Sequence, residues 1–285
     1  MGKAFSLLLP VWAGDRADHL SDAFRSTVDR QTRRPSQVVI VRDGPVSAAV
    51  AVALDDLVAA SPVPVELVVL EHNLGLGPAL DAGLARCAHD IVARMDADDV
   101  SMPNRFAVQL PVIESGVDIV GSAMLEFGDV AKDVVGRRTP PLEREQIVRY
   151  SRFHDPFNHP TVVYRRSAVL AVGGYQDLPL MEDYLLFAKM IAGGARVANV
   201  AEPLVAYRVG AGAYARRGGM GLLLSEIRIQ RRFRELGFVT GPQYVRNVVV
   251  RGAYRMVPEG MRRFAYRRFI ASYGERRARP APDHD

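Results

Sequence analysis

The sequence predicts an α/β fold, in which helices flank a mostly parallel central sheet and a helical, basic extension follows toward the C-terminal end. Two observations carry this prediction. Short apolar runs alternate with segments of helical periodicity through the first hundred residues, a pattern typical of a parallel sheet covered on both faces. Beyond about residue 214 strand-like runs cease, and helical spacing continues with a high density of arginine.

The first part of the chain alternates strands and helices regularly. The strands are expected at 4–11, 37–41, 64–70 and 91–95, and the helices between them at 18–30, 46–60 and 77–87. Ligands bind such sheets at the carboxyl ends of the strands. The loops after these four strands are therefore the expected place for chemistry.

The second part of the chain is less regular. Helices are expected at 103–114, at 142–152 and from Met181 onward, and strands at 117–127, 162–164 and 204–209. After Gly218-Gly219 the expected helices are 220–233, 244–257 and 260–273. We therefore expect an α/β domain over residues 1–213, a helical, arginine-rich extension over 214–273 and a disordered tail over 274–285.

Composition excludes several classes of protein. The 285 residues are 48% hydrophobic, enough to bury a core without disulfides. The single cysteine, Cys87, permits no intrachain disulfide, fits a reducing compartment and is expected as a small buried residue. The apolar run at 5–11 is too short for a signal peptide, and no run approaches the roughly 18 residues of a membrane span. A soluble or peripheral protein is expected.

Charge is unevenly distributed along the chain. Residues 216–279 contain sixteen arginines and four acidic residues, whereas the whole chain carries only +5. This polarity indicates a basic face that meets an anionic partner. No nucleic-acid motif accompanies the charge, so the expected partner is an anionic membrane surface and the expected location is cytoplasmic, peripheral on the inner face of the cell membrane. The alternative is a helical cap with a solvated arginine face.

Three carboxylates, Asp96, Asp98 and Asp99, follow the fourth predicted strand. Like charges this close repel one another and raise each other's pKa, a cost that a divalent cation removes. Hard carboxylate oxygens suit Mg²⁺ or Mn²⁺, which would then neutralise a diphosphate. The alternative is a loop that caps the next helix through Asp99 or Ser101.

A second acidic pair, Glu182-Asp183, begins a predicted helix, where the dipole keeps a carboxylate ionised. The functional interpretation is a general base, and the alternative is a helix cap. Asp43 follows the second strand, where it would accept from the imide N–H of uracil or initiate a turn. His159 lies in a loop beside a proline, where a lone histidine is more often structural than a metal ligand.

Arginines mark the end of the last predicted strand and the loop that follows it. Arg208 ends the strand, and Arg216 and Arg217 stand in a glycine-rich loop. Such arginines are able to clamp a diphosphate, and the alternative is a solvated loop.

Seven motifs occur together in the first 210 residues, and their order and spacing are informative jointly. They are Leu9-Pro10-Val11 with Asp15, Val41-Arg42-Asp43-Gly44, Asn73-Leu74-Gly75-Leu76-Gly77, Ala93-Arg94-Met95-Asp96-Ala97-Asp98-Asp99, Asn158-His159-Pro160-Thr161, Gly173-Gly174-Tyr175 and Glu182-Asp183-Tyr184. This set resembles the family 2 glycosyltransferases, which have the GT-A fold. The stretch from Tyr207 to Gly219 and the basic tail look like the amylovoran-type branch of bacterial capsule and exopolysaccharide enzymes, so the resemblance covers nearly the whole chain.

The resemblance implies a role for each matching position. Asp43 and Asp15 would hold the uridine, Asp96 would face the ribose or donor sugar, and Asp98 would bind the metal, Mn²⁺ or Mg²⁺. Asp183 would be the catalytic base of a single inverting displacement at the anomeric carbon. Further nucleotide-sugar contacts are expected from residues of the motifs and of the arginine loop: Pro10, Val11, Asn73, Gly77, Arg94, Glu182, Arg208, Arg216 and Arg217.

Two positions depart from the family pattern. Many relatives have a metal-binding histidine where this chain has Gly210, so the expected metal site has fewer protein ligands or receives help from His159 or a loop residue. Relatives also often have asparagine in place of Asp81.

The expected function is transfer of a hexose or an N-acetylhexosamine from a UDP-sugar to a lipid-linked glycan acceptor in surface polysaccharide biosynthesis. One alternative keeps the fold but uses dTDP-rhamnose, because thymine presents the same imide as uracil. The other is a non-catalytic nucleotide-sugar-binding protein at the membrane. The intact Asp98 and Asp183 argue against it.

Overall fold

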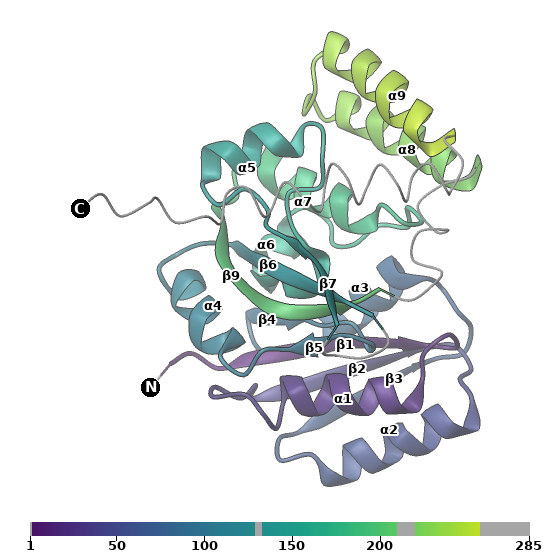
Figure 1. Cartoon of the computed structure of the whole chain (residues 1–285), viewed down its shortest axis with the longest axis vertical. Helices are drawn as coiled ribbons and strands as arrows, with labels where there is room; N and C mark the ends of the chain where they lie inside the picture. The colour runs from purple at the N-terminus through teal and green to yellow at the C-terminus, as the bar shows by residue number, and fades with distance from the viewer. Residues whose placement is uncertain (1, 129–132, 210–219, 257–285) are drawn as a thin grey trace.

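The chain forms a curled sheet with helices on both faces (Figure 1). The computed structural model describes residues 2–128, 133–209 and 220–256. Within them the strands are β1 (Phe5–Trp12), β2 (Gln37–Asp43), β3 (Val65–Leu70), β4 (Ile91–Arg94), β5 (Val100–Ser101), β6 (Ile119–Phe127), β7 (Val134–Arg138), β8 (Val163–Arg165) and β9 (Val197–Arg208). The helices are α1 (Ala17–Thr27), α2 (Ala48–Ala60), α3 (Leu76–Arg86), α4 (Arg105–Glu114), α5 (Arg144–Ser151), α6 (Arg166–Ala171), α7 (Glu182–Ala192), α8 (Met220–Glu235) and α9 (Gly241–Met256), with one 3₁₀ turn at His159–Thr161.

The sheet has the order β3-β2-β1-β4-β8-β6-β9-β5, and β7 pairs with β6. Strands β3, β2, β1 and β4 are parallel, and β6 runs parallel to β9. Strand β8 is antiparallel to both β4 and β6 and joins the two parallel groups. The predicted α/β class, with parallel strands flanked by helices, is confirmed. The parallel strands end at one edge, which carries the loops singled out from the sequence.

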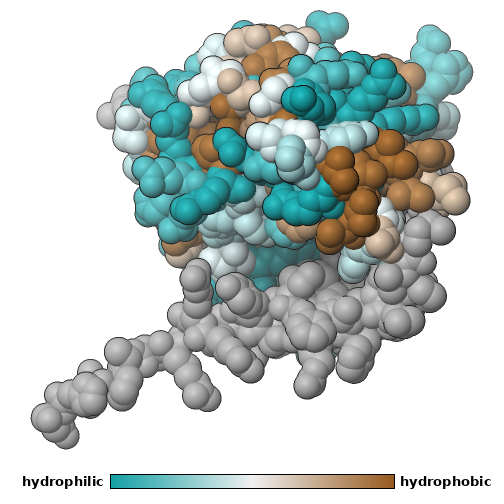
Figure 2. All heavy atoms as spheres, turned by 90° about the horizontal axis from the view of Figure 1, so that it is seen from above, coloured by the Kyte–Doolittle hydropathy of each residue, from teal (hydrophilic) through white to brown (hydrophobic). Residues whose placement is uncertain are grey.

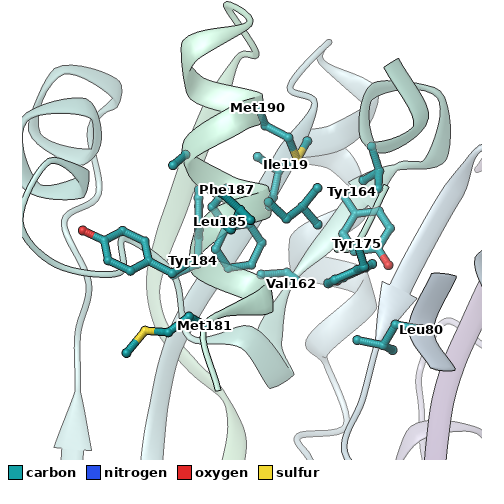
Figure 3. Packing of buried hydrophobic residues seen from close by; sticks show 14 of the residues in the cluster. Leu80, Ile119, Val162, Tyr164, Tyr175, Met181, Tyr184, Leu185, Phe187 and Met190 are labelled. Atoms are coloured by element: carbon teal, nitrogen blue, oxygen red, sulfur yellow. The ribbon is translucent and has the colours of Figure 1, made fainter. Parts of the chain in front are cut away.

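Each face of the sheet is covered by its own apolar cluster. Helices α1, α2 and α4 cover one face through residues such as Phe24, Leu54 and Phe106. On the other face α3, α5, α6, α7 and α8 contribute to a cluster that includes Tyr164 of β8 and Phe187 of α7, which Figure 3 shows together with Tyr175 and Leu185. Cys87 lies buried in this second cluster, as predicted. Two covered faces explain why the strands read as continuous apolar runs.

The differences from the predicted elements lie at sheet edges and in short segments. Strands β5 and β7 and helix α6 were not predicted, because two- to six-residue elements give too short a pattern. Strand β9 begins at Val197, whereas the sequence predicts it only from Leu204. The first part was missed because the pairing of β9 with β6 shifts register near Pro203, which breaks the alternation of the pattern. The predicted α8 and α9 are confirmed, while the expected helix at 260–273 and the tail at 274–285 lie outside the described residues.

The helical extension is joined to the α/β domain by a shared core and by a buried ion pair. Phe233 of α8 packs edge-on against Tyr184 of α7, with 4.9 Å between the ring centroids. On α9, the Arg251 guanidinium binds the Glu226 carboxylate, with 2.6 Å between Nε and Oε1, and also donates to the carbonyl of Phe153. The two helices therefore fix the loop that follows α5. No helix among residues 2–128, 133–209 and 220–256 is long and apolar enough to cross a membrane.

Candidate functional site

The three carboxylates that follow β4 lie together at the carboxyl edge of the sheet. Asp96, Asp98 and Asp99 each offer an oxygen, and these atoms all lie within 4.8 Å of one another. Asp96 and Asp98 are partly exposed, whereas Asp99 is fully buried. Burial, with the nearby charge of Asp96, raises the pKa of Asp98 to about 6. The loop therefore concentrates negative charge at an accessible position.

A buried arginine beneath this loop compensates part of the charge. Arg94, the last residue of β4, is 1% exposed and binds Asp96 with both terminal nitrogens, at 2.6 Å between Nη1 and Oδ2. A bidentate pair of this kind fixes the carboxylate in one orientation. Asp96 thus has both oxygens engaged by the chain, whereas Asp98, which is partly exposed, forms no such ion pair among the described contacts.

Asp99 supplies the observation that tests the fit of a divalent cation. Its Oδ1 accepts from the backbone N–H of Arg208 at 2.8 Å, but its buried Oδ2 has no hydrogen-bond partner among the described residues. An unpartnered carboxylate oxygen beside two other carboxylates fits a hard cation such as Mg²⁺ or Mn²⁺. The alternative prediction that Asp99 or Ser101 caps the next helix is wrong, because Asn104 stands at the N-cap of α4.

A second buried arginine, not predicted from the sequence, supports the end of β4 from below. Arg105 donates to the carbonyl oxygen of Arg94 at 2.7 Å and to Ser101 Oγ at 3.1 Å. Its neighbour one turn on, Gln109, donates to the carbonyl of Thr161 at 2.8 Å. The available signal in the sequence was a charged residue on the apolar face of a helix, which a satisfied polar network explains.

The predicted base lies at the start of α7 beside two buried aromatic residues. The carboxylate of Asp183 accepts from the N–H of Tyr184 at 2.7 Å, and its Oδ2 is 3.6 Å from His159 Nδ1. The other ring nitrogen of His159 lies 3.0 Å from the hydroxyl of Tyr175. Burial lowers the pKa of His159 far below its usual value, so the ring is neutral. Both nitrogens thus face Tyr175 and Asp183, and His159 is not part of the three-carboxylate cluster.

Burial also acts on the two acidic residues of α7. It raises the pKa of Asp183, and it raises the pKa of Glu182 to about 7, helped by the charge of Asp183. The Arg94 guanidinium opposes both increases and also acts on Asp98. The charge of one buried arginine therefore acts on both the acidic pair of α7 and the carboxylates after β4.

The glycine-rich loop before α3 packs closely against the start of α7. A Cβ atom at Gly77 would lie 2.9 Å from the carbonyl oxygen of Gln176 and 3.2 Å from Cβ of Glu182. Asp81, one turn further along α3, accepts from the N–H of Tyr175 at 3.2 Å. Asp81, where relatives often have asparagine, thus has a structural role, because its carboxylate holds the turn that carries Tyr175.

Asp43 and Asp15 lie at the ends of β2 and β1. Asp43 is 3% exposed and accepts from the N–H groups of Leu74 and Gly75, at 2.7 and 3.0 Å. It therefore holds the loop after β3, and any contact with a base would use its remaining lone pairs. Asp15 accepts from Trp12 N–H at 2.8 Å, and burial, with a smaller contribution from the nearby Asp98 and Asp96, raises its pKa to about 7.

The remaining predicted contacts are placed as follows. Pro10 and Val11 are buried within β1, between β2 and β4, and Asn73 is exposed in the loop after β3. Arg208 donates from Nε to the carbonyl of Asp98 at 2.9 Å and so positions the acidic loop. Arg216, Arg217 and Gly210 lie outside the described residues, and the predictions for them remain predictions.

Comparison with known proteins gives consistent results. The family model described as glycosyl transferase family 2 matches residues 6–173. The chain is 36% identical over 270 residues to the amylovoran biosynthesis glycosyltransferase AmsE of Erwinia amylovora, covering 92% of this chain and 97% of that protein. It is 33% identical over 275 residues to the UDP-Gal:α-D-GlcNAc-diphosphoundecaprenol β-1,3-galactosyltransferase of Escherichia coli, covering 94% and 97%.

Solved structures show the same fold at low sequence identity. The structure of S. aureus TarS 1–349 with UDP-GlcNAc has a TM-score of 0.67 at 15% identity and covers 96% of this chain and 78% of that chain. The mannosyltransferase PcManGT of Pyrobaculum calidifontis, with GDP-Man and Mn²⁺, has a TM-score of 0.63 at 16% identity, covering 98% and 76%. These similarities show the GT-A fold.

Proposed function

The chain belongs to glycosyl transferase family 2, and from this premise we propose that it transfers a sugar from a UDP-sugar to a glycan acceptor with inversion at the anomeric carbon. The observation that carries the proposal is the position of the buried Arg94, which binds Asp96 among the carboxylates after β4 and whose charge also acts on the acidic pair that begins α7. One group suits a metal-bound diphosphate, and the other suits a proton acceptor. An inverting displacement is helped by both, a proton acceptor for the attacking hydroxyl and stabilisation of the charge on the leaving diphosphate.

In this proposal Asp183 accepts the proton of the acceptor hydroxyl while that oxygen attacks the anomeric carbon. The bond between the anomeric carbon and the diphosphate oxygen breaks, and UDP departs with its electron pair. We assign His159 to the orientation of Asp183 rather than to the metal. When Tyr175 donates to Nε2, the ring carries its proton on Nδ1, which faces Asp183.

The carboxylates after β4 would hold the metal. Asp98 and Asp99 are the proposed ligands, because Asp96 already has both oxygens bound by Arg94. A bound Mn²⁺ or Mg²⁺ supplies charge neutralisation on the leaving diphosphate. The buried Arg105 holds the backbone of this loop, and Arg208 holds the Asp98 carbonyl, so the ligands are fixed before any substrate arrives.

The donor proposal rests on the comparisons. One relative is named for UDP-Gal, and a solved neighbour contains UDP-GlcNAc. We propose a UDP-hexose or a UDP-N-acetylhexosamine as donor, with a role in surface polysaccharide biosynthesis, as in the relative named for amylovoran. A panel of nucleotide sugars tested with Mn²⁺ is expected to give UDP release with UDP-sugars.

The panel separates the alternatives, because each predicts a different product. Release of dTDP from dTDP-rhamnose, with no UDP release, would identify the rhamnosyltransferase alternative. Binding without release of any nucleotide would identify a non-catalytic binding protein and contradict the proposal. The same panel with Asp183→Asn is the matched control for release that does not depend on the site.

We further propose a lipid-linked acceptor and peripheral attachment to an anionic membrane. One relative's name includes a diphosphoundecaprenol acceptor. Helices α8 and α9 expose large apolar side chains, among them Met220, Leu224, Val245 and Val249, together with exposed arginines such as Arg234. Figure 2 looks onto this end of the molecule, where apolar residues gather beside hydrophilic ones. Apolar groups bordered by arginine are typical of interfacial helices.

Liposome co-sedimentation tests this attachment. The chain is expected to bind vesicles that contain an anionic lipid and to dissociate as the salt concentration rises, because each arginine near the surface contributes about 1 kcal/mol of screened attraction. Replacing Val245 and Val249 together with serine should weaken binding. Ala253→Ser, also on α9, is the matched control. Equal binding to neutral vesicles, or no binding to either, would rule the attachment out.

A further inference from the structure

A cleft adjoins the site at Tyr175. Its volume is about 630 Å³. It lies between the loop before α7 and the helices α7 and α8, and it is lined by Gly173, Tyr175, Gln176, Asp177, Leu178, Leu185, Arg228 and Arg232. None of the roles proposed above uses the two arginines of this lining.

The arginines give the cleft its chemistry. Arg228 and Arg232 are one helical turn apart on α8, so their side chains share a face. Arg228 is exposed and has no ion-pair or hydrogen-bond partner among residues 2–128, 133–209 and 220–256. Arg232 makes one exposed ion pair, at 3.2 Å between Nη1 and Glu235 Oε2, which leaves donors of its guanidinium free. Asp177 is the only acid in the lining, so two cations face one anion.

The position of the cleft relates it to the base. Its wall includes Tyr175, whose hydroxyl lies against His159, and His159 in turn faces Asp183. Leu185 of α7, also in the wall, leaves the helix on a different side from Asp183, two residues earlier, and Figure 3 shows it beside Phe187. A molecule in the cleft would therefore be separated from Asp183 by Tyr175 and His159, whereas the donor diphosphate belongs with the carboxylates after β4.

We propose that this cleft binds the diphosphate of the acceptor, with Arg228 and Arg232 as the anion-binding residues and Leu178 beside the start of the lipid. The inference rests on the proposed function and adds to it the site and the chemical class of the acceptor's anchoring group. Guanidinium groups suit phosphate oxygens because they donate two parallel hydrogen bonds. With the diphosphate anchored there, the adjoining sugar would extend past Tyr175 toward the site of Asp183.

The first test compares two acceptors that carry the same sugar, one as an alkyl diphosphate and one as a neutral alkyl glycoside. In the full chain, Arg228→Gln with Arg232→Gln is expected to raise the KM for the diphosphate acceptor by about tenfold or more, since charge-assisted hydrogen bonds are lost. The KM for the UDP-sugar and the KM for the neutral acceptor should stay unchanged. Arg25→Gln, at an exposed arginine of α1 outside the cleft lining, is the matched control.

A rise in the KM for the UDP-sugar would instead place the donor diphosphate in the cleft and overturn the inference. An equal loss with both acceptors would indicate a structural role and would also overturn it.

The second test does not depend on turnover. Calorimetric titration with a short prenyl diphosphate, with UDP and Mn²⁺ saturating the donor site, should show binding that the double variant weakens about tenfold. If the native chain does not bind the prenyl diphosphate, or the double variant binds it equally well, the inference is overturned, whether or not the chain transfers sugar. If the chain binds the prenyl diphosphate as expected but transfers no sugar, only the proposed function is contradicted.

Discussion

Replacing Asp183 with asparagine is expected to lower turnover by about 10²- to 10⁴-fold, the usual contribution of a positioned general base. Asparagine has nearly the same shape and keeps an oxygen for the N–H of Tyr184, but its amide does not take up a proton. Burial raises the pKa of Asp183, which brings its basicity closer to that needed at neutral pH. The measurements are kcat from UDP release and the dissociation constant of the UDP-sugar.

Donor binding should survive this substitution, because Asp183 belongs to the acceptor side of the proposed site. The matched control is Asp56→Asn, since Asp56 is an exposed carboxylate on α2, on the opposite face of the sheet. A thermal melt should show that both variants fold. Turnover near that of the native chain in the Asp183 variant would exclude this residue as the base, and a lost affinity for donor would assign it to nucleotide-sugar binding.

Removing the metal, or replacing Asp98 with asparagine, is expected to have the second large effect. Excess EDTA should abolish transfer, and added Mn²⁺ should restore it. In the Asp98→Asn variant the Mn²⁺ concentration required for half-maximal activity should rise by about 100-fold or more, because altering even the residues that support a metal ligand costs roughly 10- to 100-fold. The buried, unpartnered oxygen of Asp99 should then be insufficient to retain the ion.

The matched control for this experiment is Asp118→Asn. Asp118 is also a partly buried carboxylate near arginines, Arg165 and Arg196, but it lies away from the carboxylates after β4. Its variant should need the same Mn²⁺ concentration as the native chain. Transfer that proceeds at full rate in excess EDTA would show that the three carboxylates do not act through a metal.

The location of the acidic loop could be predicted because it depends on a general rule. An apolar run that ends in Asp96 places that residue at the carboxyl edge of a parallel sheet, whatever the details of packing. The chain contacts of Asp43 and Arg208 could not be predicted in the same way. Both hold backbone groups of loops distant in sequence, and a sequence pattern does not reveal which loop a side chain meets.

The environment of Asp183 shows the same limit. The sequence marks His159 as a residue of interest, but its position between Tyr175 and Asp183 depends on how three separate segments of the chain fold over the second apolar cluster. Arg105 was missed for a different reason. A charge on a helix face otherwise filled with Phe106, Leu110 and Ile113 contradicts the usual amphipathic pattern, and only the partners in the structure explain it.

The joining of α8 to α7 bears on how such enzymes diversify. Leu222, Ile229 and Phe233 belong to the same buried cluster as Tyr184, and Arg251 of α9 is bound into the loop after α5. A chimera made at the junction near residue 213 would therefore exchange part of a core, leaving apolar surface and the carbonyl of Phe153 without matched neighbours. New acceptor specificities in this architecture should therefore arise by single substitutions along α8 and the loop before α7. Exchange of the whole pair of helices between relatives should give chains that fold poorly.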